Sequence, residues 1–279
     1  MTVFIEILKA VLFGIVEGIT EWLPVSSTGH IILLDEFIFL AGSEEFKSMF
    51  DVVIQLGAII AVVILFWRKL NPFNSQKNEQ QRQMIWSLWV KVLVAVLPSA
   101  LLGLLLDDWL DEYLYNHVVV ALALVGYGVA FLFLERPDKP RTIRAKGVHA
   151  IDIRTAVLIG CFQCLALIPG TSRSGSTILG GMLMGVSRAA ASEFSFYLAI
   201  PTMLGASLLK MGKFLFSGVG MNVTEFFVLI FGCVTAFGVS MFVIRKLMEF
   251  VRSNSFAVFG LYRIALGTVV ILYFLISLL

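Results

Sequence analysis

The sequence predicts an all-α integral membrane protein of two inverted-topology repeats, each a re-entrant helix hairpin followed by three transmembrane helices. Three observations lead to this fold class: an apolar composition, six apolar runs of spanning length, and a polar motif that recurs in the second half. Of the 279 residues, 59% are hydrophobic and 14% are charged, whereas soluble domains carry about 25% charged residues. The mean hydropathy is +0.93. The composition therefore predicts a chain embedded in a bilayer.

The six apolar runs are each close to the roughly 20 residues that a helix needs to cross a bilayer. None shows the alternating pattern of a membrane barrel, so the runs are expected to be helices. They cover about 49–67, 87–106, 118–134, 190–209, 224–244 and 256–276. The net charge of +2 says little about partners. From the apolar runs the expected partner is the bilayer, and no nucleic acid is expected.

Two short polar segments interrupt this apolar sequence. The first reads Glu17-Gly-Ile-Thr-Glu21-Trp-Leu-Pro-Val-Ser26-Ser27-Thr28-Gly29-His30, and the second reads Pro169-Gly170-Thr171-Ser172-Arg173-Ser174-Gly175-Ser176-Thr177. A shift of 146 residues lays the first on the second, with Ser26 on Ser172, and it also lays Gly14 on Gly160 and Glu17 on Gln163. A short apolar piece of about ten residues follows each motif, at 31–40 and 177–186. Such pieces are too short to cross, and they predict re-entrant hairpins around a midplane site.

The repeats also predict how the chain lies in the membrane. We expect one membrane domain, 1–279, with repeat one at about 1–135 and repeat two at about 150–279. Basic residues cluster at 68–82, 136–154 and 245–252, which predicts cytoplasmic loops, and acidic residues at 35–45 and 107–112 should face outward. The first hairpin would then enter from the outer face and the second from the cytoplasm, with their tips meeting. The alternative topology has both hairpins crossing fully.

The first motif begins with two carboxylates on one helix face. Glu17 and Glu21 are four residues apart, and two such charges in a low dielectric need a metal ion, a nearby cation or a shared proton. Two glutamates facing water at a helix end are the structural alternative. The hydroxyl residues after Pro24 should cap a second helix whose free N–H groups favour a phosphate. His30 follows within a turn, as a candidate proton carrier or nucleophile.

The second motif supplies a cation and more donors. The guanidinium of Arg173 matches phosphate oxygens two at a time, and Gly170 and Gly175 would let the backbone approach a ligand closely. An arginine that reaches out to lipid headgroups is the alternative. Together the two motifs predict a site for phosphoryl transfer. Elsewhere, Asp51 and Gln55 could hydrogen-bond the site or only pack, and Arg263 is expected to be buried and to pair with a glutamate.

These motifs resemble those of the undecaprenyl-diphosphatase family, also called the bacitracin-resistance proteins. The resemblance extends to Phe50-Asp-Val-Val-Ile-Gln55-Leu-Gly-Ala and Tyr262-Arg263-Ile-Ala-Leu-Gly267 and covers the chain from end to end. It implies a multi-pass enzyme of the bacterial plasma (inner) membrane whose active site opens toward the outer face. The enzyme would convert undecaprenyl diphosphate to undecaprenyl phosphate and inorganic phosphate, recycling the lipid carrier of cell-wall synthesis and conferring bacitracin resistance. A divalent cation, Mg²⁺ or Ca²⁺, is also implied, and whether two copies form a homodimer stays open.

The resemblance also suggests roles for the motif residues. Ser27 is the preferred nucleophile with His30 as acid/base, and direct attack by His30 is the alternative. Glu21 and Arg173 complete the catalytic set, and Glu17 and Glu21 are the candidate metal ligands. The predicted phosphate-binding residues are Ser26, Thr28, Ser172, Arg173, Ser174, Gly175, Ser176 and Thr177.

Two other functions compete with this interpretation. A transporter or flippase of prenyl (di)phosphates could use the same inverted-repeat pocket without cleaving its cargo. The type 2 phosphatidic acid phosphatase superfamily has a similar Ser-Gly-His element, but its chemistry needs a second histidine downstream of the Ser-Arg pair. The chain has three histidines, and none follows Arg173.

Overall fold

The computed structural model describes residues 2–114, 116–138 and 142–277. Over these ranges the regular secondary structure consists of helices, apart from one isolated β-bridge. Within these residues, six helices are long and apolar enough to cross a membrane. They are α3 (Glu44–Leu70), α4 (Glu79–Leu114), α5 (His117–Leu134), α8 (Arg188–Phe216), α9 (Val223–Ser253) and α10 (Ala257–Ser277). Each coincides with one predicted apolar run, so the prediction of an all-α integral membrane protein is confirmed. The predicted basic loop at 136–154 and the acidic stretch at 107–112 fall partly outside the residues and side chains described.

The remaining helices form two hairpins around the polar motifs. In the first, α1 (Thr2–Thr20) turns into α2 (Ser27–Asp35). In the second, the short 3-10 turn η1 (Val148–Ala150) precedes α6 (Ile153–Cys164), whose end continues as η2 (Leu165–Leu167), and the chain then turns into α7 (Arg173–Leu183). At 1.5 Å per residue, α2 and α7 reach only about 14 and 17 Å, about half of a bilayer core.

Both short helices begin about four residues earlier than the apolar pattern predicts. Their starts are set by serine caps rather than by hydrophobicity. The side chain of Ser26 accepts a hydrogen bond from Gly29 N, and that of Ser172 accepts one from Gly175 N. An N-cap serine satisfies an N–H group that a helix start otherwise leaves without a partner. The polar residues of each motif therefore form the first turn of a helix, and the predicted hydroxyl cap after Pro24 is confirmed at Ser26.

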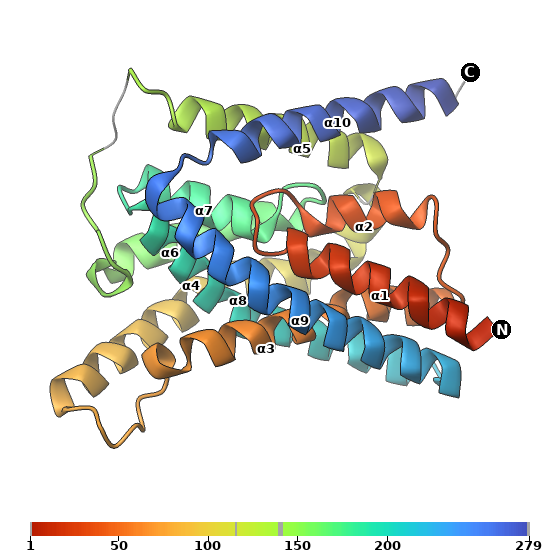
Figure 1. The fold of residues 1–279 in the computed structure, drawn as a ribbon, viewed down its shortest axis with the longest axis horizontal. Coiled ribbons are helices and arrows are strands. Elements are labelled where there is room, and N and C mark those ends of the chain that lie inside the picture. Colours follow the sequence, from red (N-terminus) through yellow and green to blue (C-terminus); the bar gives the residue numbers. More distant parts are fainter. Residues whose placement is uncertain (1, 115, 139–141, 278–279) are drawn as a thin grey trace.

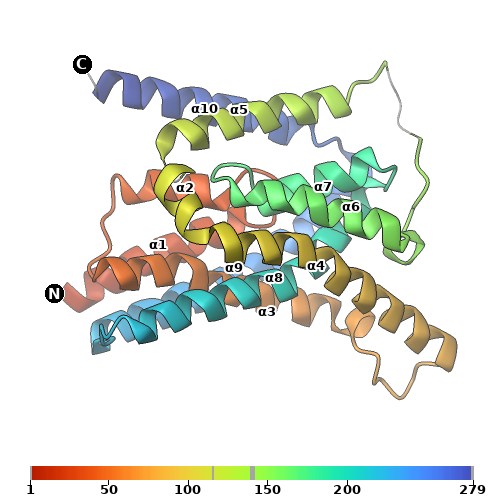
Figure 2. The same cartoon turned by 180° about the vertical axis from the view of Figure 1, so that it is seen from behind.

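The two hairpins enter the molecule from opposite ends and meet in its middle. Figure 1 shows α1 running inward from the N-terminal end and α2 returning toward that end, while α6 and α7 do the same from the other end. The reverse view in Figure 2 shows the same arrangement. The turns are joined directly, because Ser174 Oγ donates to the carbonyl oxygens of Glu21 and Leu23 at 2.9 and 3.1 Å.

Long helices surround the hairpins in matching pairs. Helix α1 packs along α9 and α6 packs along α4, while α5 and α10 lie side by side along one edge (Figure 1). Small residues allow the close approach that membrane helices require. A Cβ added to Gly14 of α1 would lie 2.5 Å from the carbonyl oxygen of Gly232, and one added to Gly160 of α6 would lie 2.2 Å from that of Ala95. The two glycines that the 146-residue shift superimposes thus have equivalent packing roles.

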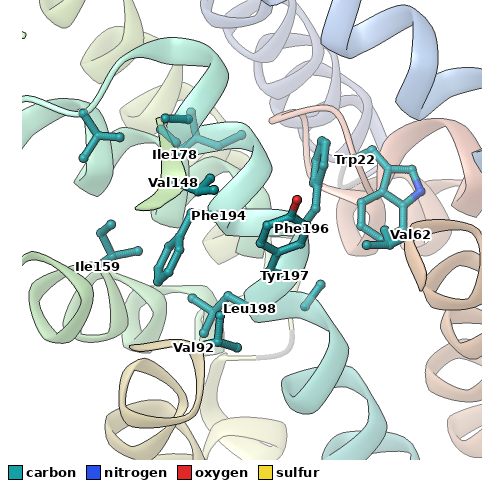
Figure 3. Close-up of a cluster of buried hydrophobic side chains, with 14 of the residues drawn as sticks. Trp22, Val62, Val92, Val148, Ile159, Ile178, Phe194, Phe196, Tyr197 and Leu198 are labelled. Atoms are coloured by element: carbon teal, nitrogen blue, oxygen red, sulfur yellow. The ribbon is translucent and has the colours of Figure 1, made fainter. Parts of the chain in front are cut away.

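The largest apolar cluster, drawn in Figure 3, holds the first turn against α8. The indole of Trp22, which directly follows Glu21, is fully buried. It packs edge-on against the ring of Phe196, with 5.3 Å between the ring centroids. Neighbouring residues of α8, including Phe194 and Tyr197, are buried in the same cluster. Burial of this aromatic group fixes the position of the Glu21 backbone relative to α8.

Candidate active site

A cavity of about 400 Å³ lies where the two turns meet. Its polar wall comes from both motifs, and its other walls come from α3, α4, α6, η2 and α8. The motif residues that line it are Glu21, Ser27, Thr28, Ser172 and Arg173, and four more polar residues line it from elsewhere, namely Gln55, Ser99, Gln163 and Thr202. Most of the remaining lining is apolar, with side chains such as Val96, Leu104 and Leu209. The cavity therefore joins a polar end to an apolar end.

Both turns use the same unusual backbone conformation. Ser26 has φ 73° and Ser172 has φ 75°, and in the described part of the chain these are the two non-glycine residues with positive φ. Such a conformation costs roughly 1–3 kcal/mol for a residue with a side chain, and it persists where the surrounding structure enforces it. It places each serine hydroxyl as a cap on the following helix, with Oγ to N distances of 3.2 and 3.0 Å.

The first turn provides a hydroxyl paired with a carboxylate. Ser27 Oγ donates to Glu21 Oε2 at 2.6 Å, and both groups are buried. A hydroxyl hydrogen-bonded to a carboxylate can lose its proton to that carboxylate as it attacks an electrophile. Ser27 and Glu21 thus have the geometry of a nucleophile and its general base.

The second turn brings a guanidinium to the same carboxylate. Arg173 Nη2 lies 2.9 Å from Glu21 Oε1, so the predicted meeting of the two motifs is present. The Nη1 atom donates to the carbonyl oxygen and the hydroxyl of Ser195 at 2.7 and 3.1 Å, and the guanidinium lies over the ring of Trp22. The Nε atom is buried and has no hydrogen-bond partner in the part of the chain that the structure describes. Arg173 is therefore held rigidly while one N–H is left for an additional acceptor.

Glu17 lies behind this pair. Its side chain is 1% exposed, and it lies one helical turn before Glu21, whose backbone N–H donates to the carbonyl oxygen of Glu17 at 3.0 Å. Glu17 Oε1 is buried without a hydrogen-bond partner among the described residues. Glu17 does not line the cavity. Among the described residues no group of three or more His, Cys, Asp or Glu side chains could hold a metal ion. Mg²⁺ is often bound by one or two carboxylates, with waters and substrate phosphate completing its shell, and a glutamate pair with an open oxygen fits that pattern.

His30 is not among the residues that line the cavity. Nδ1 lies 2.6 Å from the carbonyl oxygen of Ser26, and Nε2 lies 2.6 Å from the hydroxyl of Tyr262. Because a carbonyl oxygen only accepts, Nδ1 carries the hydrogen, and Nε2 of the neutral ring accepts from Tyr262. The structure thus pairs Ser27 with Glu21, whereas sequence reasoning paired it with His30.

Several of the predicted phosphate-binding hydroxyls are used within the protein. Ser174 Oγ joins the two turns, Ser176 Oγ donates to the carbonyl oxygen of Arg173 at 3.0 Å, and Thr177 Oγ1 donates to the same oxygen at 2.8 Å. Of the predicted set, Thr28, Ser172 and Arg173 line the cavity, and Ser26, Ser174, Gly175, Ser176 and Thr177 do not. These five residues shape the turns.

Arg263 of α10 connects the backbones of both turns. It is fully buried and donates to the carbonyl oxygens of Pro24 and Gly170 at 3.1 and 2.8 Å. It also donates to the carbonyl oxygens of Ala123 and Leu124. The prediction that Arg263 pairs with a glutamate is wrong. Its guanidinium instead binds carbonyl groups, including those at the ends of the turns, which would otherwise be buried without donors.

Sequence reasoning also missed supporting residues. Ser195 fixes Arg173 and shares a hydrogen bond with the hydroxyl of Thr177, yet it is a lone serine in an apolar run. Tyr262 directly precedes Arg263 in a recognised motif, and its position there was the available signal.

Residues 10–269 match the family described as bacitracin resistance protein BacA. The chain belongs to this family. Several BacA relatives are similar over nearly their whole length. The undecaprenyl-diphosphatase of Acetivibrio thermocellus is 53% identical over 271 residues, which is 97% of this chain and 98% of that protein. The Enterococcus faecalis undecaprenyl-diphosphatase is 54% identical, covering 96% of this chain and 97% of its own, and that of Streptococcus mutans is 50% identical, covering 99% of each. The family resemblance expected from the motifs is confirmed.

Proposed function

We propose that this protein hydrolyses undecaprenyl diphosphate to undecaprenyl phosphate and inorganic phosphate, recycling the lipid carrier of cell-wall synthesis. Relatives at 50–54% identity carry the name undecaprenyl-diphosphatase, and the BacA family name implies bacitracin resistance. The observation that carries the proposal is the Ser27–Glu21–Arg173 constellation at the polar end of a largely apolar cavity.

The first chemical step follows from these contacts. Ser27 Oγ attacks the terminal phosphorus of the diphosphate and gives its proton to Glu21. The bond from that phosphorus to the bridging oxygen breaks, and the leaving undecaprenyl phosphate takes the electron pair and then the proton from Glu21. Arg173 stabilises the charge that develops on the phosphoryl oxygens, with its partnerless Nε–H among the donors.

His30 has a positioning role in this proposal. Its Nδ1–H holds the carbonyl oxygen of Ser26, and Ser26 is the strained residue that sets the position of Ser27. An acid-quenched reaction distinguishes the nucleophiles, since phosphoserine is stable in acid and phosphohistidine is not. We expect acid-stable label on Ser27; acid-labile label on His30 would restore direct attack by histidine.

Glu17 and Glu21 are the residues that would hold a divalent cation, Mg²⁺ or Ca²⁺. The open oxygen of Glu17 supports this assignment. When bound, such an ion would neutralise charge on the diphosphate. Through its contacts with Ser27 and Arg173, Glu21 would also keep the starts of α2 and α7 oriented toward the substrate.

The apolar part of the cavity is suited to the lipid chain. It is lined by α4 and α8 residues such as Leu104 and Leu209, and both helices contain an internal proline, Pro98 and Pro201. Prolines remove backbone hydrogen bonds and favour kinks. The prenyl chain would leave the site between these two helices, toward the surrounding lipid.

The two halves would be inverted-topology repeats at about 1–135 and 150–279, forming one domain with the site at the bilayer midplane. Support comes from the opposed hairpins (Figure 1), the equivalent caps Ser26 and Ser172, and the equivalent glycines Gly14 and Gly160. The charge distribution favours a plasma-membrane orientation in which the cavity opens outward. With the three native cysteines replaced, a single cysteine at Ser43 should then react with an impermeant reagent on intact cells, whereas one at Ser75 should not.

A flippase is the second candidate, because hairpins that enter from both faces are also found in carriers. Purified protein in detergent micelles, where no compartments exist, separates the two functions. We expect inorganic phosphate and undecaprenyl phosphate to form in equal amounts, and Ser27→Ala to abolish both. Binding of undecaprenyl diphosphate without phosphate release would reject hydrolysis.

A further inference from the structure

A second polar group lines the cavity without belonging to either motif. Gln163 of α6 is 2% exposed, and its Nε2 donates to Ser99 Oγ of α4 at 2.5 Å and to Thr202 Oγ1 of α8 at 3.2 Å. All three side chains line the same cavity as Ser27 and Arg173. Three different helices thus converge on one amide.

The orientation of this amide is fixed by its partners. The hydroxyl of Ser99 donates to the carbonyl oxygen of Val96 at 3.0 Å, and that of Thr202 donates to the carbonyl oxygen of Leu198 at 2.8 Å. Each hydroxyl has one hydrogen and donates it to a carbonyl oxygen, so both accept from Gln163 in this arrangement. The structure places the NH₂ group toward the two hydroxyls, and Oε1 faces away from them.

Gln163 Oε1 is buried and has no hydrogen-bond partner in the described residues. A buried acceptor without a donor is unfavourable, so such an atom on a side chain that lines a polar cavity indicates a ligand that donates. Phosphate oxygens are mainly acceptors and would be repelled by it. Water is the donor that the proposed reaction requires at this cavity.

We propose that Gln163 positions the water that hydrolyses the phosphoenzyme, an inference that rests on the proposed function. One O–H of the water donates to Gln163 Oε1, and its oxygen attacks the phosphorus bound to Ser27. The bond from phosphorus to Ser27 Oγ breaks, and the electron pair goes to Oγ. The other proton of the water passes to Glu21 and then to Oγ, which restores the Ser27 hydroxyl. The proton held toward Gln163 leaves on inorganic phosphate.

The repeat explains why an amide is suited to this place. The 146-residue shift lays Glu17 on Gln163, so equivalent positions hold a carboxylate in one half and a neutral amide in the other. A carboxylate facing the phosphoryl dianion would repel it, whereas the amide oxygen accepts a hydrogen bond without adding a charge. The neutral amide of Gln163 can therefore hold the water close to the phosphoryl group.

The test separates the two chemical steps with undecaprenyl diphosphate in detergent micelles. Gln163→Met keeps the length of the side chain and removes the acceptor. We expect steady-state phosphate release to fall about 10- to 100-fold, as for a misplaced reactant. The first turnover should still release undecaprenyl phosphate in a burst approaching one per protein, with phosphoserine accumulating.

A second variant guards against loss of folding. Ser99→Ala removes one acceptor that orients the amide and should give the same burst with a smaller fall in steady-state rate. The matched control is Ser207→Ala, which deletes a buried hydroxyl of α8 that, like that of Ser99, is bonded to a backbone carbonyl group but lies outside the cavity lining. It should leave both steps unchanged.

The outcomes are distinct. If wild-type protein releases no phosphate, the proposed function fails. If wild type turns over and folded Gln163→Met or Ser99→Ala shows neither burst nor phosphoserine, the role of Gln163 is wrong and hydrolysis stands. Unchanged turnover in Gln163→Met would also overturn the proposed role of Gln163.

Discussion

The two turns have the same backbone geometry and opposite chemistry. Ser26 and Ser172 have nearly the same φ and cap the following helix in the same way. Yet the first turn presents a carboxylate and a hydroxyl at the cavity, and the second presents a guanidinium. A single backbone motif, used twice, thus positions both groups of a charge-complementary site. The geometry is repeated and the chemistry is divided, so each half alone lacks a reaction centre.

The division predicts the largest effects at the two charged groups. Glu21→Gln removes the base on Ser27, and Arg173→Lys removes the planar fork while keeping a cation. Each should lower kcat by about 10³-fold or more, the scale for losing a group that stabilises a transition state. Phosphate release from undecaprenyl diphosphate gives kcat, and gel filtration in detergent verifies folding. Near-wild-type turnover by either folded variant would remove that residue from the reaction.

The next effect tests whether Glu17, whose counterpart in the second half is the neutral Gln163, is a metal ligand. Glu17→Gln should raise the Mg²⁺ concentration for half-maximal activity by about 10-fold, because one of two ligand carboxylates is lost. A titration of activity with Mg²⁺ after chelator treatment measures it. Glu225→Gln is the matched control, since Glu225 is a buried carboxylate that caps α9. An unchanged Mg²⁺ dependence in Glu17→Gln would exclude Glu17 as a ligand.

A smaller effect tests how His30 acts. His30→Asn can keep a donor near the carbonyl oxygen of Ser26, whereas His30→Phe cannot. We expect the asparagine variant to remain within about 10-fold of wild-type kcat and the phenylalanine variant to fall further, as a positioning bond worth about 1–3 kcal/mol would dictate. Steady-state kinetics of both variants provide the comparison. Equal, severe losses would instead assign His30 a proton-transfer role.

The smallest effect concerns the joint between the turns. Ser174→Ala removes the hydroxyl that donates to the first turn, and it should cost about 1 kcal/mol of stability. Thermal unfolding in detergent should show a lowered Tm, with kcat reduced only a few-fold. Ser176→Ala, whose hydroxyl bonds within its own helix, is the comparison variant and should leave kcat unchanged. Equal kcat for the two variants would show that the joint does not align the site.

Hydrophobicity and the internal repeat were enough to predict the membrane helices and the meeting of Glu21 with Arg173. Apolar length determines a spanning helix, and matching motifs in opposed hairpins indicated a shared site. The internal hydrogen bonding was beyond reach. Whether a serine such as Ser176 faces a ligand or its own backbone depends on local geometry, as does the choice between Glu21 and His30 as the partner of Ser27.

Arg263 and Gln163 illustrate the other gap. An arginine in an apolar helix suggests a carboxylate partner, but four carbonyl groups satisfy it here. The partners of Gln163 come from α4 and α8, distant in sequence and without any motif. Contacts of this kind are fixed by tertiary packing, and a single sequence does not encode them in a recognisable spacing.

The most direct measurement is a double-mutant cycle on kcat/KM between the two turns, with Glu21→Gln, Arg173→Lys and the double variant acting on undecaprenyl diphosphate. Residues that act as one unit are strongly non-additive. If the turns form one reaction centre, the double variant should be no more than a few-fold slower than the slower single variant. If the two losses multiply, Glu21 and Arg173 act independently, and a shared site is contradicted.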